Sequence, residues 1–302
     1  MRTLTLALVA GLSLTGFSTA QAADLDYGVL RGPDYEPELR AIDWNGVYVG
    51  GFAGYSSASL SFKNVFQPLV AKELKDTTAE AEFNASTLLA PVSTRVDGAS
   101  YGAFVGYNYQ FDDTVIGIEA DYTRFDVMGS TSDAIARYKT TTGGYLETVA
   151  LTGTSSTTVQ DYGTIRARAG YAFGSLLPFI TGGLAIGRAV VTDQVGVQNY
   201  GYDQTTYQSN LQLTTGSPAY VNRYGYAAFD QRNPGAGTPA APTVIRQSKI
   251  KTVGGVTLGA GVEFALTQNI ILRGEYQYVL FNDFDGHKVN MNTVRAGAAL
   301  KF

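Results

Sequence analysis

Residues 270–281, IILRGEYQYVLF, constrain the fold more than any other segment, because successive side chains alternate in character. Leu272 and Tyr276 share one face of an extended chain, and Arg273 and Glu275 share the other. The segment is therefore predicted to be a β-strand with an apolar face and a charged face. Such a strand turns its apolar face inward in a water-soluble barrel, but its charged face inward in a barrel that spans a bilayer.

Seven other stretches have a similar character, which gives eight predicted strands. They are residues 44–57, 98–111, 115–129, 159–173, 178–194, 251–265, 269–283 and 290–302. No long stretch places apolar residues at helical spacing, and beyond the N-terminal segment no apolar run is long enough for a spanning helix. The chain is therefore predicted to be all-β, and any membrane span must be made of strands.

The connections between the predicted strands alternate between two kinds. Tight turns are expected at residues 112–114, 174–177 and 266–268. The other connections are residues 58–97, 130–158 and 195–250, and a short hairpin at 284–289 built on Asp285-Gly286. Outer-membrane barrels have short periplasmic turns and longer extracellular loops, and in lipid the ring must close because no backbone group can stay unpaired. We predict an eight-stranded antiparallel up-and-down transmembrane β-barrel with short periplasmic turns and long extracellular loops.

The charged faces of the strands are predicted to line the lumen. They hold four acids and five bases, and such a balance suits an interior, since an unpaired buried charge is costly. The predicted lumen charge network is Glu119, Asp121, Arg166, Arg168, Glu263, Arg273, Glu275, Arg295 and Lys301. Small residues on the same face leave room for these side chains; they are Gly102, Gly106, Gly117, Gly170, Gly255, Gly259, Gly261 and Gly297. Eight strands enclose a space that side chains fill, so a wide channel is not expected. The alternative is a soluble lipocalin-like barrel with the apolar faces inside.

Two features of the apolar faces bear on the membrane. Phe111, Phe173, Phe264 and Phe302 end the four even-numbered strands on the apolar face, where aromatic rings form a girdle at one bilayer interface. Arg188 has the same parity as the apolar residues of its strand, so a bulge or an interfacial position is required there.

The N-terminal residues 1–22 are predicted to be a secretory signal peptide. Arg2 precedes an apolar stretch, and cleavage is expected after Ala20-Gln21-Ala22, next to Ala23. Residues 23–43 are predicted to be a flexible periplasmic leader, and residues 44–302 the barrel. The chain contains no cysteine, which excludes disulfides and thiolate sites, and its net charge of −4 does not favour nucleic acid as a partner.

The segment DWNGVYVGGFAGY at residues 43–55, with residues 293–297 and the terminal Lys301-Phe302, resembles the small outer-membrane β-barrel proteins of alpha-proteobacteria. These are the RopB-like surface antigens, often labelled "porin family", and the resemblance spans about residues 41–302. It implies a monomeric or loosely associated barrel in the Gram-negative outer membrane that contributes to envelope integrity and exposes loops to hosts or phage. Some relatives are described as haemin binders. Phe302 is similar to the terminal residue that the outer-membrane assembly machinery recognises.

Candidate chemistry in the sequence is sparse. His287 follows Asp285-Gly286 and is predicted to be exposed on a hairpin, because no convergent ligands or nucleophile accompany it. A hydrolase acid–base role for His287 remains an alternative, but we predict no enzyme activity, no cofactor and no metal site. Aromatic and arginine residues in 195–250 form either a contact surface or an extension of the strands; they are Tyr200, Tyr202, Tyr207, Tyr220, Tyr224, Tyr226, Phe229, Arg223, Arg232 and Arg246.

The most favoured function is a non-enzymatic surface barrel that supports the envelope and interacts through its loops. Expected partners are outer-membrane lipids and lipopolysaccharide, the assembly machinery, and a host molecule or haem at the loops. The alternatives are a small diffusion channel and a barrel that binds haem or a host ligand.

Overall fold

A computed structural model describes residues 42–302 of the chain. The predicted signal peptide, its cleavage residues Ala20, Ala22 and Ala23, and nearly all of the predicted leader lie outside the described residues. Within residues 42–302, no helix is long and apolar enough to cross a bilayer.

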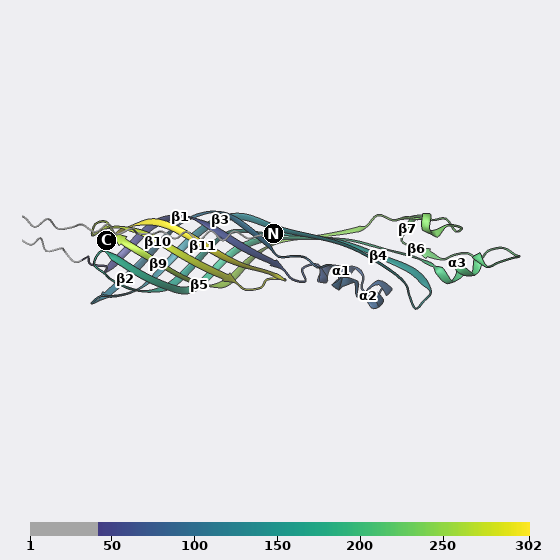
Figure 1. Cartoon of the computed structure of the whole chain (residues 1–302), viewed down its shortest axis with the longest axis horizontal. Coiled ribbons are helices and arrows are strands. Elements are labelled where there is room, and N and C mark those ends of the chain that lie inside the picture. Colours follow the sequence, from purple (N-terminus) through teal and green to yellow (C-terminus); the bar gives the residue numbers. More distant parts are fainter. Residues whose placement is uncertain (1–41) are drawn as a thin grey trace, which may run out of the picture. The chain divides into compact units, whose positions relative to one another are not determined.

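Eight long antiparallel strands of the described chain form a closed ring (Figure 1). The strands are β1 (Gly46–Phe62), β2 (Thr94–Phe111), β3 (Thr114–Thr140), β4 (Tyr145–Tyr171), β5 (Leu176–Asp203), β9 (Thr243–Ala265), β10 (Ile270–Phe281) and β11 (His287–Lys301). Their order is β4-β3-β2-β1-β11-β10-β9-β5, and β5 pairs with β4 to close the ring. The first and last strands pair from Tyr48 opposite Lys301 to Phe62 opposite His287. The predicted all-β barrel is therefore confirmed.

The connections at the two ends of the ring differ in length. At one end, the turns after β2, β4 and β9 are short, and two of them use backbone in the left-handed region, at Asp112 (φ 51°) and Gly174 (φ 62°). At the other end, residues 63–93 and 204–242 form long connections. The β10–β11 hairpin also lies there, with positive φ at both Asp285 and Gly286, as a type I′ turn requires.

The prediction that residues 130–158 form a long loop was wrong. β3 continues to Thr140 and β4 begins at Tyr145, so only a tight turn separates them. Val149 and Leu151 on β4 are buried on the inner face, whereas their neighbours are Thr, Ala and Gly. In this segment apolar and polar residues alternate only weakly, so the strand is hard to recognise in the sequence. Its β-branched residues nevertheless favour extended backbone.

Four strands extend past the rest of the ring and form a curved sheet, which we call the arm (Figure 1). It comprises residues 127–140 of β3, 145–159 of β4, 190–203 of β5 and 243–250 of β9. Residues 58–97 and 195–250, predicted as loops, thus contribute strand to their neighbours. They also contain α1 (Gln67–Glu73), α2 (Thr78–Phe83), η1 (Ala85–Thr87), α3 (Gln204–Leu211), β6 (Arg223–Tyr224), β7 (Tyr226–Ala228), η2 (Pro234–Ala236) and β8 (Thr238–Pro239).

The inner face of the arm is covered by α1 and the residues around it. Phe66 and Val70 are buried in one apolar cluster with Leu151 and Val195 of the strands. Gly153 lies beneath Phe66, and a Cβ there would be 2.8 Å from the Phe66 ring. The residues of α1 therefore supply the arm with an apolar core, and this cluster continues into the adjoining end of the ring through Tyr162, Val279 and Phe281.

A second apolar cluster fills the ring at the end with the tight turns. It includes Trp44, Tyr48, Phe104, Leu177 and Ile271, all nearly without exposed surface. The two apolar clusters thus occupy the two ends of the interior, and the polar side chains lie between them.

Candidate functional site: the charged lumen and the outer rim

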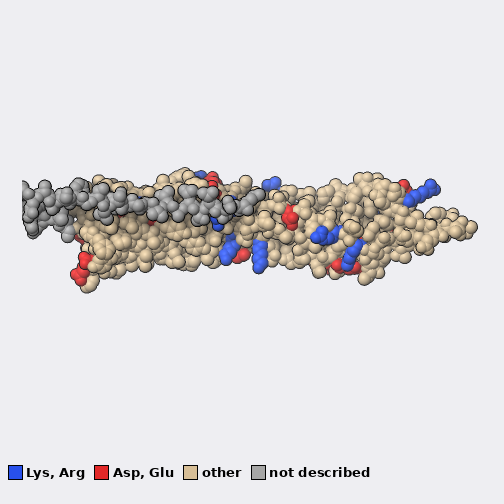
Figure 2. All heavy atoms as spheres, viewed as in Figure 1, with Lys and Arg blue, Asp and Glu red and all other residues tan. Residues whose placement is uncertain are grey.

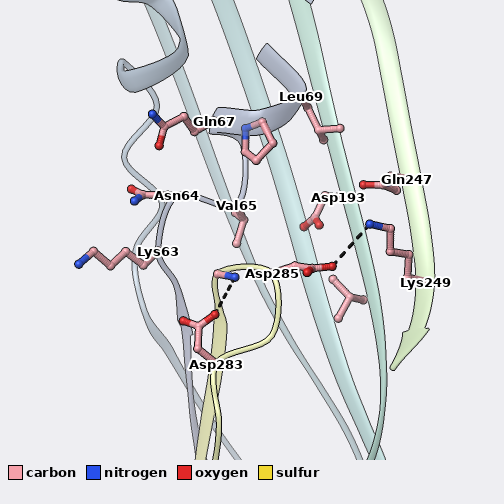
Figure 3. Close-up of a pocket in the computed structure, with 13 residues that line it drawn as sticks. Lys63, Asn64, Val65, Gln67, Leu69, Asp193, Gln247, Lys249, Asp283 and Asp285 are labelled. Atoms are coloured by element: carbon pink, nitrogen blue, oxygen red, sulfur yellow. Dashed lines mark hydrogen bonds and ion pairs between the residues drawn. The ribbon is translucent and has the colours of Figure 1, made fainter. Parts of the chain in front are cut away.

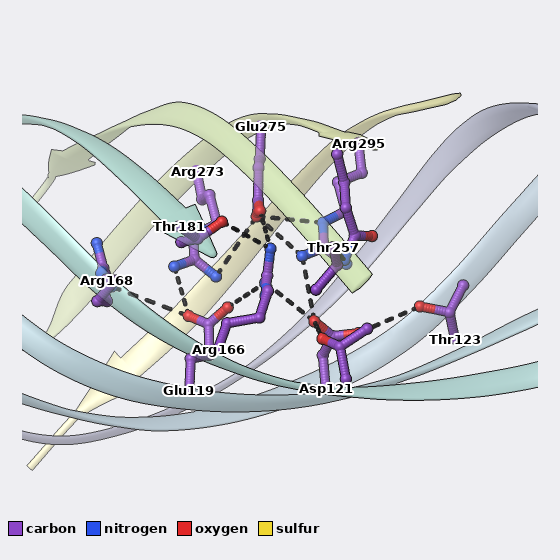
Figure 4. Close-up of polar contacts among 12 residues, drawn as sticks. Glu119, Asp121, Thr123, Arg166, Arg168, Thr181, Thr257, Arg273, Glu275 and Arg295 are labelled. Carbon is purple, nitrogen blue, oxygen red and sulfur yellow. Dashed lines mark hydrogen bonds and ion pairs between the residues drawn. The ribbon is translucent and has the colours of Figure 1, made fainter. Parts of the chain in front are cut away.

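The middle of the lumen holds a cluster of charged side chains (Figure 4). The structure brings together eight of the nine predicted residues, all buried: Glu119, Asp121, Arg166, Arg168, Glu263, Arg273, Glu275 and Arg295. We call these eight residues the lumen network; they carry four negative and four positive charges. Lys301 is also buried but stands apart, because its Nζ donates to the backbone oxygen of Asp43 at the end with the tight turns.

Strand register explains the first set of ion pairs in the lumen network. Residues directly opposite on antiparallel strands point to the same face. Glu119 lies opposite Arg166, and these two side chains form an ion pair. Arg273 lies opposite Glu263, with Nε 2.9 Å from Oε1, and Arg295 lies opposite Glu275, at 3.0 Å between Nη2 and Oε2. Six of the eight charges therefore have a partner directly opposite on a neighbouring strand, whereas Asp121 and Arg168 lie opposite uncharged residues.

A second set of ion pairs crosses the lumen. Arg273 Nη2 of β10 lies 2.5 Å from Glu119 Oε2 of β3, and Arg168 Nη2 of β4 lies 2.8 Å from Glu263 Oε2 of β9. Arg166 also forms an ion pair with Glu275 on β10. These contacts tie non-adjacent strands together, which backbone pairing alone does not do.

Tyr48 joins the lumen network to the apolar cluster beneath it, and sequence reasoning did not single it out. Its hydroxyl donates to Glu119 Oε2 at 2.8 Å and accepts from Arg168 Nη1 at 2.9 Å. The Arg273 guanidinium stacks 4.5 Å from the Phe104 ring and 4.8 Å from the Phe179 ring. The sequence does indicate Tyr48, because strand alternation places it on the same inward face of the first strand as Phe52.

The outer surface of the ring is apolar. Ile118, Leu258 and Leu272 are 57%, 62% and 42% exposed, whereas the charges of the network are buried. Phe111, Phe173, Phe264 and Phe302 are all exposed. A soluble barrel has the reverse arrangement, so the lipocalin-like alternative does not fit the structure.

Basic side chains on the outside lie at the outer rim, where the ring gives way to the arm, and further out along the arm (Figure 2). Arg188 keeps its outward position and forms an ion pair with Asp161 at 2.6 Å, next to a register shift in β4. Lys249 and Lys251 bind Asp285 of the β10–β11 hairpin at 3.5 and 2.8 Å. The hydrogen bond from Lys251 lowers the pKa of Asp285 below its usual value.

His287 is not exposed, and that prediction was wrong. It is the first residue of β11, where the alternation already points its side chain inward, and none of its surface is accessible. Its Nδ1 lies 2.8 Å from Thr157 Oγ1, and its Nε2 lies 3.4 Å from Asp193 Oδ2. The rings of Phe62 and Phe284 pack against it. The buried imidazole thus serves the packing of the rim.

A cavity of about 600 Å³ opens at the outer rim between the start of α1, the β10–β11 hairpin, β5 and β9 (Figure 3). Lys63 and Lys249 lie on opposite sides of this rim cavity, and Asp193, Asp283 and Asp285 lie between them. Within residues 42–302, no group of three or more His, Cys, Asp or Glu side chains is placed to hold a metal ion. The cavity is suited to a small polar ligand.

The aromatic residues of 195–250 pack mostly on one another. Tyr202 contacts Tyr207 and Phe229 at 5.9 Å between ring centroids, and Tyr226 contacts Phe229 at 4.9 Å. Arg223 stacks 4.8 Å from the Phe229 ring, and Tyr220 is exposed. Most of these rings are therefore used to fold the tip of the arm.

The family model described as "Outer membrane protein beta-barrel domain" matches residues 9–302. The chain belongs to this family. Membership places the barrel in the outer membrane of a Gram-negative cell, and the tight turns then face the periplasm.

Individual relatives of this outer-membrane barrel agree with the family match. It is 28% identical, over the full length of both chains, to the 31 kDa outer-membrane immunogenic proteins of Brucella melitensis biotype 1 and Brucella suis biovar 1. Among solved structures, Ail, the attachment invasion locus protein of Yersinia pestis, aligns at 12% identity and a TM-score of 0.29, over 85% of this chain and 99% of that one. At this TM-score the fold rests on the strand pairings described above.

Proposed function

We propose that this outer-membrane barrel is a non-enzymatic, non-conducting surface protein that contributes to envelope integrity and interacts through its arm. The observation that carries the proposal is the filled interior. Eight paired charges lie between two apolar clusters, so the space that a channel requires is taken by side chains. The arm, in turn, holds the long connections clear of the ring.

A complementation experiment tests this proposal. Cells that lack the gene are expected to become sensitive to detergent, and the full chain to restore resistance. A variant with residues 204–242 replaced by a short Gly-Ser linker should restore resistance as well, but should lose binding to host surfaces. Unchanged detergent sensitivity after deletion would contradict the envelope role, and full surface binding by the linker variant would contradict the role of the arm.

Planar bilayers distinguish the proposal from a diffusion channel. The purified chain is expected to show no stable open state, because the lumen network blocks the pore. Stepwise conductance by the purified chain would instead favour a diffusion channel.

Lipopolysaccharide is the lipid partner that the outer rim favours. Lys249 and Lys251 outnumber their shared partner Asp285, and Arg188 lies at the same end of the ring. Cations at this level suit the phosphate groups of the outer leaflet. Added lipopolysaccharide should raise the unfolding temperature of the barrel more than neutral lipid does, and the variant with Lys249→Gln and Lys251→Gln should lose part of this gain.

The end of the chain fits the expected role in assembly. The Phe302 ring is exposed beside the tight turns, and its backbone N–H donates to the carbonyl of Val47 at 2.9 Å. Phe302→Ala should slow insertion by the assembly machinery, and an unchanged amount of folded barrel in the membrane would contradict this role.

A ligand-binding role is the second candidate, because the rim cavity is large enough for a small molecule. Haem is a weaker fit than a polar host molecule, since the chain's one histidine is buried and cannot reach an iron ion from outside. The absorbance of added haem should therefore not show histidine ligation. His287→Ala should also leave phospholipid and lipopolysaccharide composition unchanged, and an altered composition would support an enzyme.

A further inference from the structure

Glu147 is a buried acidic side chain without an ion-pair partner among residues 42–302. It lies on the inner face of β4, near the tip of the arm, and none of its surface is exposed. Among the contacts of residues 42–302, neither carboxylate oxygen of Glu147 has a hydrogen-bond partner. The four acids of the lumen network, by contrast, all have arginine partners.

The nearby cations are engaged elsewhere. Lys139 lies directly opposite Glu147 on β3, but its Nζ binds Glu82 of α2 at 3.1 Å and lies over the Phe83 ring. Arg223 donates to the Tyr220 hydroxyl at 3.2 Å and stacks on a phenylalanine ring. Among the described residues Glu147 therefore has no ion-pair partner, a state that costs several kcal/mol for an ionised carboxylate.

Glu147 lines a cavity of about 320 Å³ that reaches the surface between α2, the β3–β4 turn and β6. Tyr145 and Tyr224 form part of the wall, with ring centroids 6.0 Å apart and planes inclined at 37°. Thr78 and Gly143, which are exposed, stand at its opening. We call this space the tip cavity.

Tyr145 and Tyr224 add aromatic ring faces beside the carboxylate. Arg223 also lines the tip cavity, but its guanidinium stacks on the Phe229 ring and donates to the Tyr220 hydroxyl. Burial and the adjacent Glu147 raise the pKa of Tyr224, so its phenol stays neutral at physiological pH. The Tyr224 hydroxyl lies near Glu147, and a single hydroxyl donor can satisfy only one of the two carboxylate oxygens. A carboxylate beside aromatic ring faces attracts an organic cation, through charge pairing and cation–π contact.

We propose that the tip cavity binds a short free primary amine as its ammonium ion. In this arrangement the ammonium group meets Glu147, and the alkyl chain lies along the rings of Tyr145 and Tyr224. The small volume suits a short amine, because pockets for drug-sized ligands are generally larger. The site is independent of the proposed envelope function.

Ligand-observed NMR on the full chain in detergent micelles tests the proposal, with n-butylammonium chloride as the probe and n-butanol as its neutral counterpart. We expect saturation transfer to butylammonium but not to butanol. Glu147→Gln should weaken binding by about tenfold or more, since it removes the charge pair and keeps the shape. Glu73→Gln, at an exposed position of α1, should leave binding unchanged. Equal binding of butanol, or undiminished binding by Glu147→Gln, would overturn the proposal.

Two further measurements keep the test decisive. Heat-modifiable migration on gels shows whether Glu147→Gln is folded, and if it is not, the comparison of butylammonium with butanol on the unaltered chain decides. Lys139→Gln removes the only cation that lies opposite Glu147 among the described strands. This variant should bind butylammonium at least as well as the unaltered chain, and a loss of binding would show that Lys139, not an amine, belongs to the site.

Discussion

Arg273 and Glu119 lie on strands four places apart in a ring of eight, and Arg273 Nη2 is nevertheless 2.5 Å from Glu119 Oε2. The two strands, β10 and β3, are therefore opposite one another, and the ion pair spans the lumen. Such a contact is possible only in a narrow ring, in which side chains fill the interior. The lumen network thus connects opposite walls of the barrel through ion pairs.

Removal of one acid from the lumen network should destabilise the barrel strongly. Glu119 contacts both Arg166 and Arg273, so Glu119→Gln takes one counter-charge from each of two buried guanidinium groups and leaves the lumen network with a net positive charge. We expect a loss of about 3–5 kcal/mol, and a lower temperature for the heat-modifiable gel shift. The exposed Glu73→Gln is the control. If both variants showed the gel shift at the same temperature, the stabilising role of these ion pairs would be contradicted.

Deletion of a single oxygen tests the link between the network and the apolar cluster. Tyr48→Phe keeps the ring in place but removes the hydroxyl that bonds Glu119 and Arg168. Bonds to charged groups contribute more than neutral ones, so we expect a loss of about 1.5–3 kcal/mol in denaturant unfolding. A variant as stable as the parent would mean that the two charged groups satisfy each other without Tyr48.

A methyl group on the lumen face should not be tolerated where a ring lies against the backbone. A Cβ at Gly106 would be 2.2 Å from the Tyr48 hydroxyl oxygen, whereas a Cβ at Gly274, on the lipid face, would meet nothing within 4 Å. Gly106→Ala should therefore cost about 1–3 kcal/mol in denaturant unfolding, and Gly274→Ala much less. Similar costs for the two variants would contradict the tight packing of the lumen.

The sequence could predict the lumen because strand alternation is a local property. The parity of Arg166 and Glu119 places both side chains inside without any knowledge of the neighbouring strands. It could not predict which acid Arg273 meets across the ring, because that depends on the tilt and stagger of the strands. Tyr48 was overlooked for a related reason, since its two partners lie on β3 and β4.

The outer end of the barrel was harder to predict than the lumen. Beyond the membrane, water can contact the outer face of a strand, and the apolar signal that defines a spanning strand is lost. Residues 145–159 accordingly lack a clear alternation, although every second side chain packs inward. His287 was predicted to be exposed because it was assigned to the turn. In the structure it is already the first residue of β11, and its side chain points inward. Sequence rules locate the turn but not the depth at which it lies.

The ion pair at the outer rim should make stability depend on pH. Lys251, hydrogen-bonded to Asp285 at 2.8 Å, holds the pKa of Asp285 below its usual value. A carboxyl with a lowered folded pKa stabilises the fold above its unfolded pKa, near 4, and loses this contribution as the pH falls through the folded value. Asp285→Asn should therefore lower the free energy of unfolding at neutral pH by less than about 1 kcal/mol, because the pair is so exposed. The difference from the parent should vanish once the pH has fallen below the folded pKa of Asp285. Lys251→Gln should behave in the same way, and a difference that persists in acid for either variant would contradict the contribution of this ion pair.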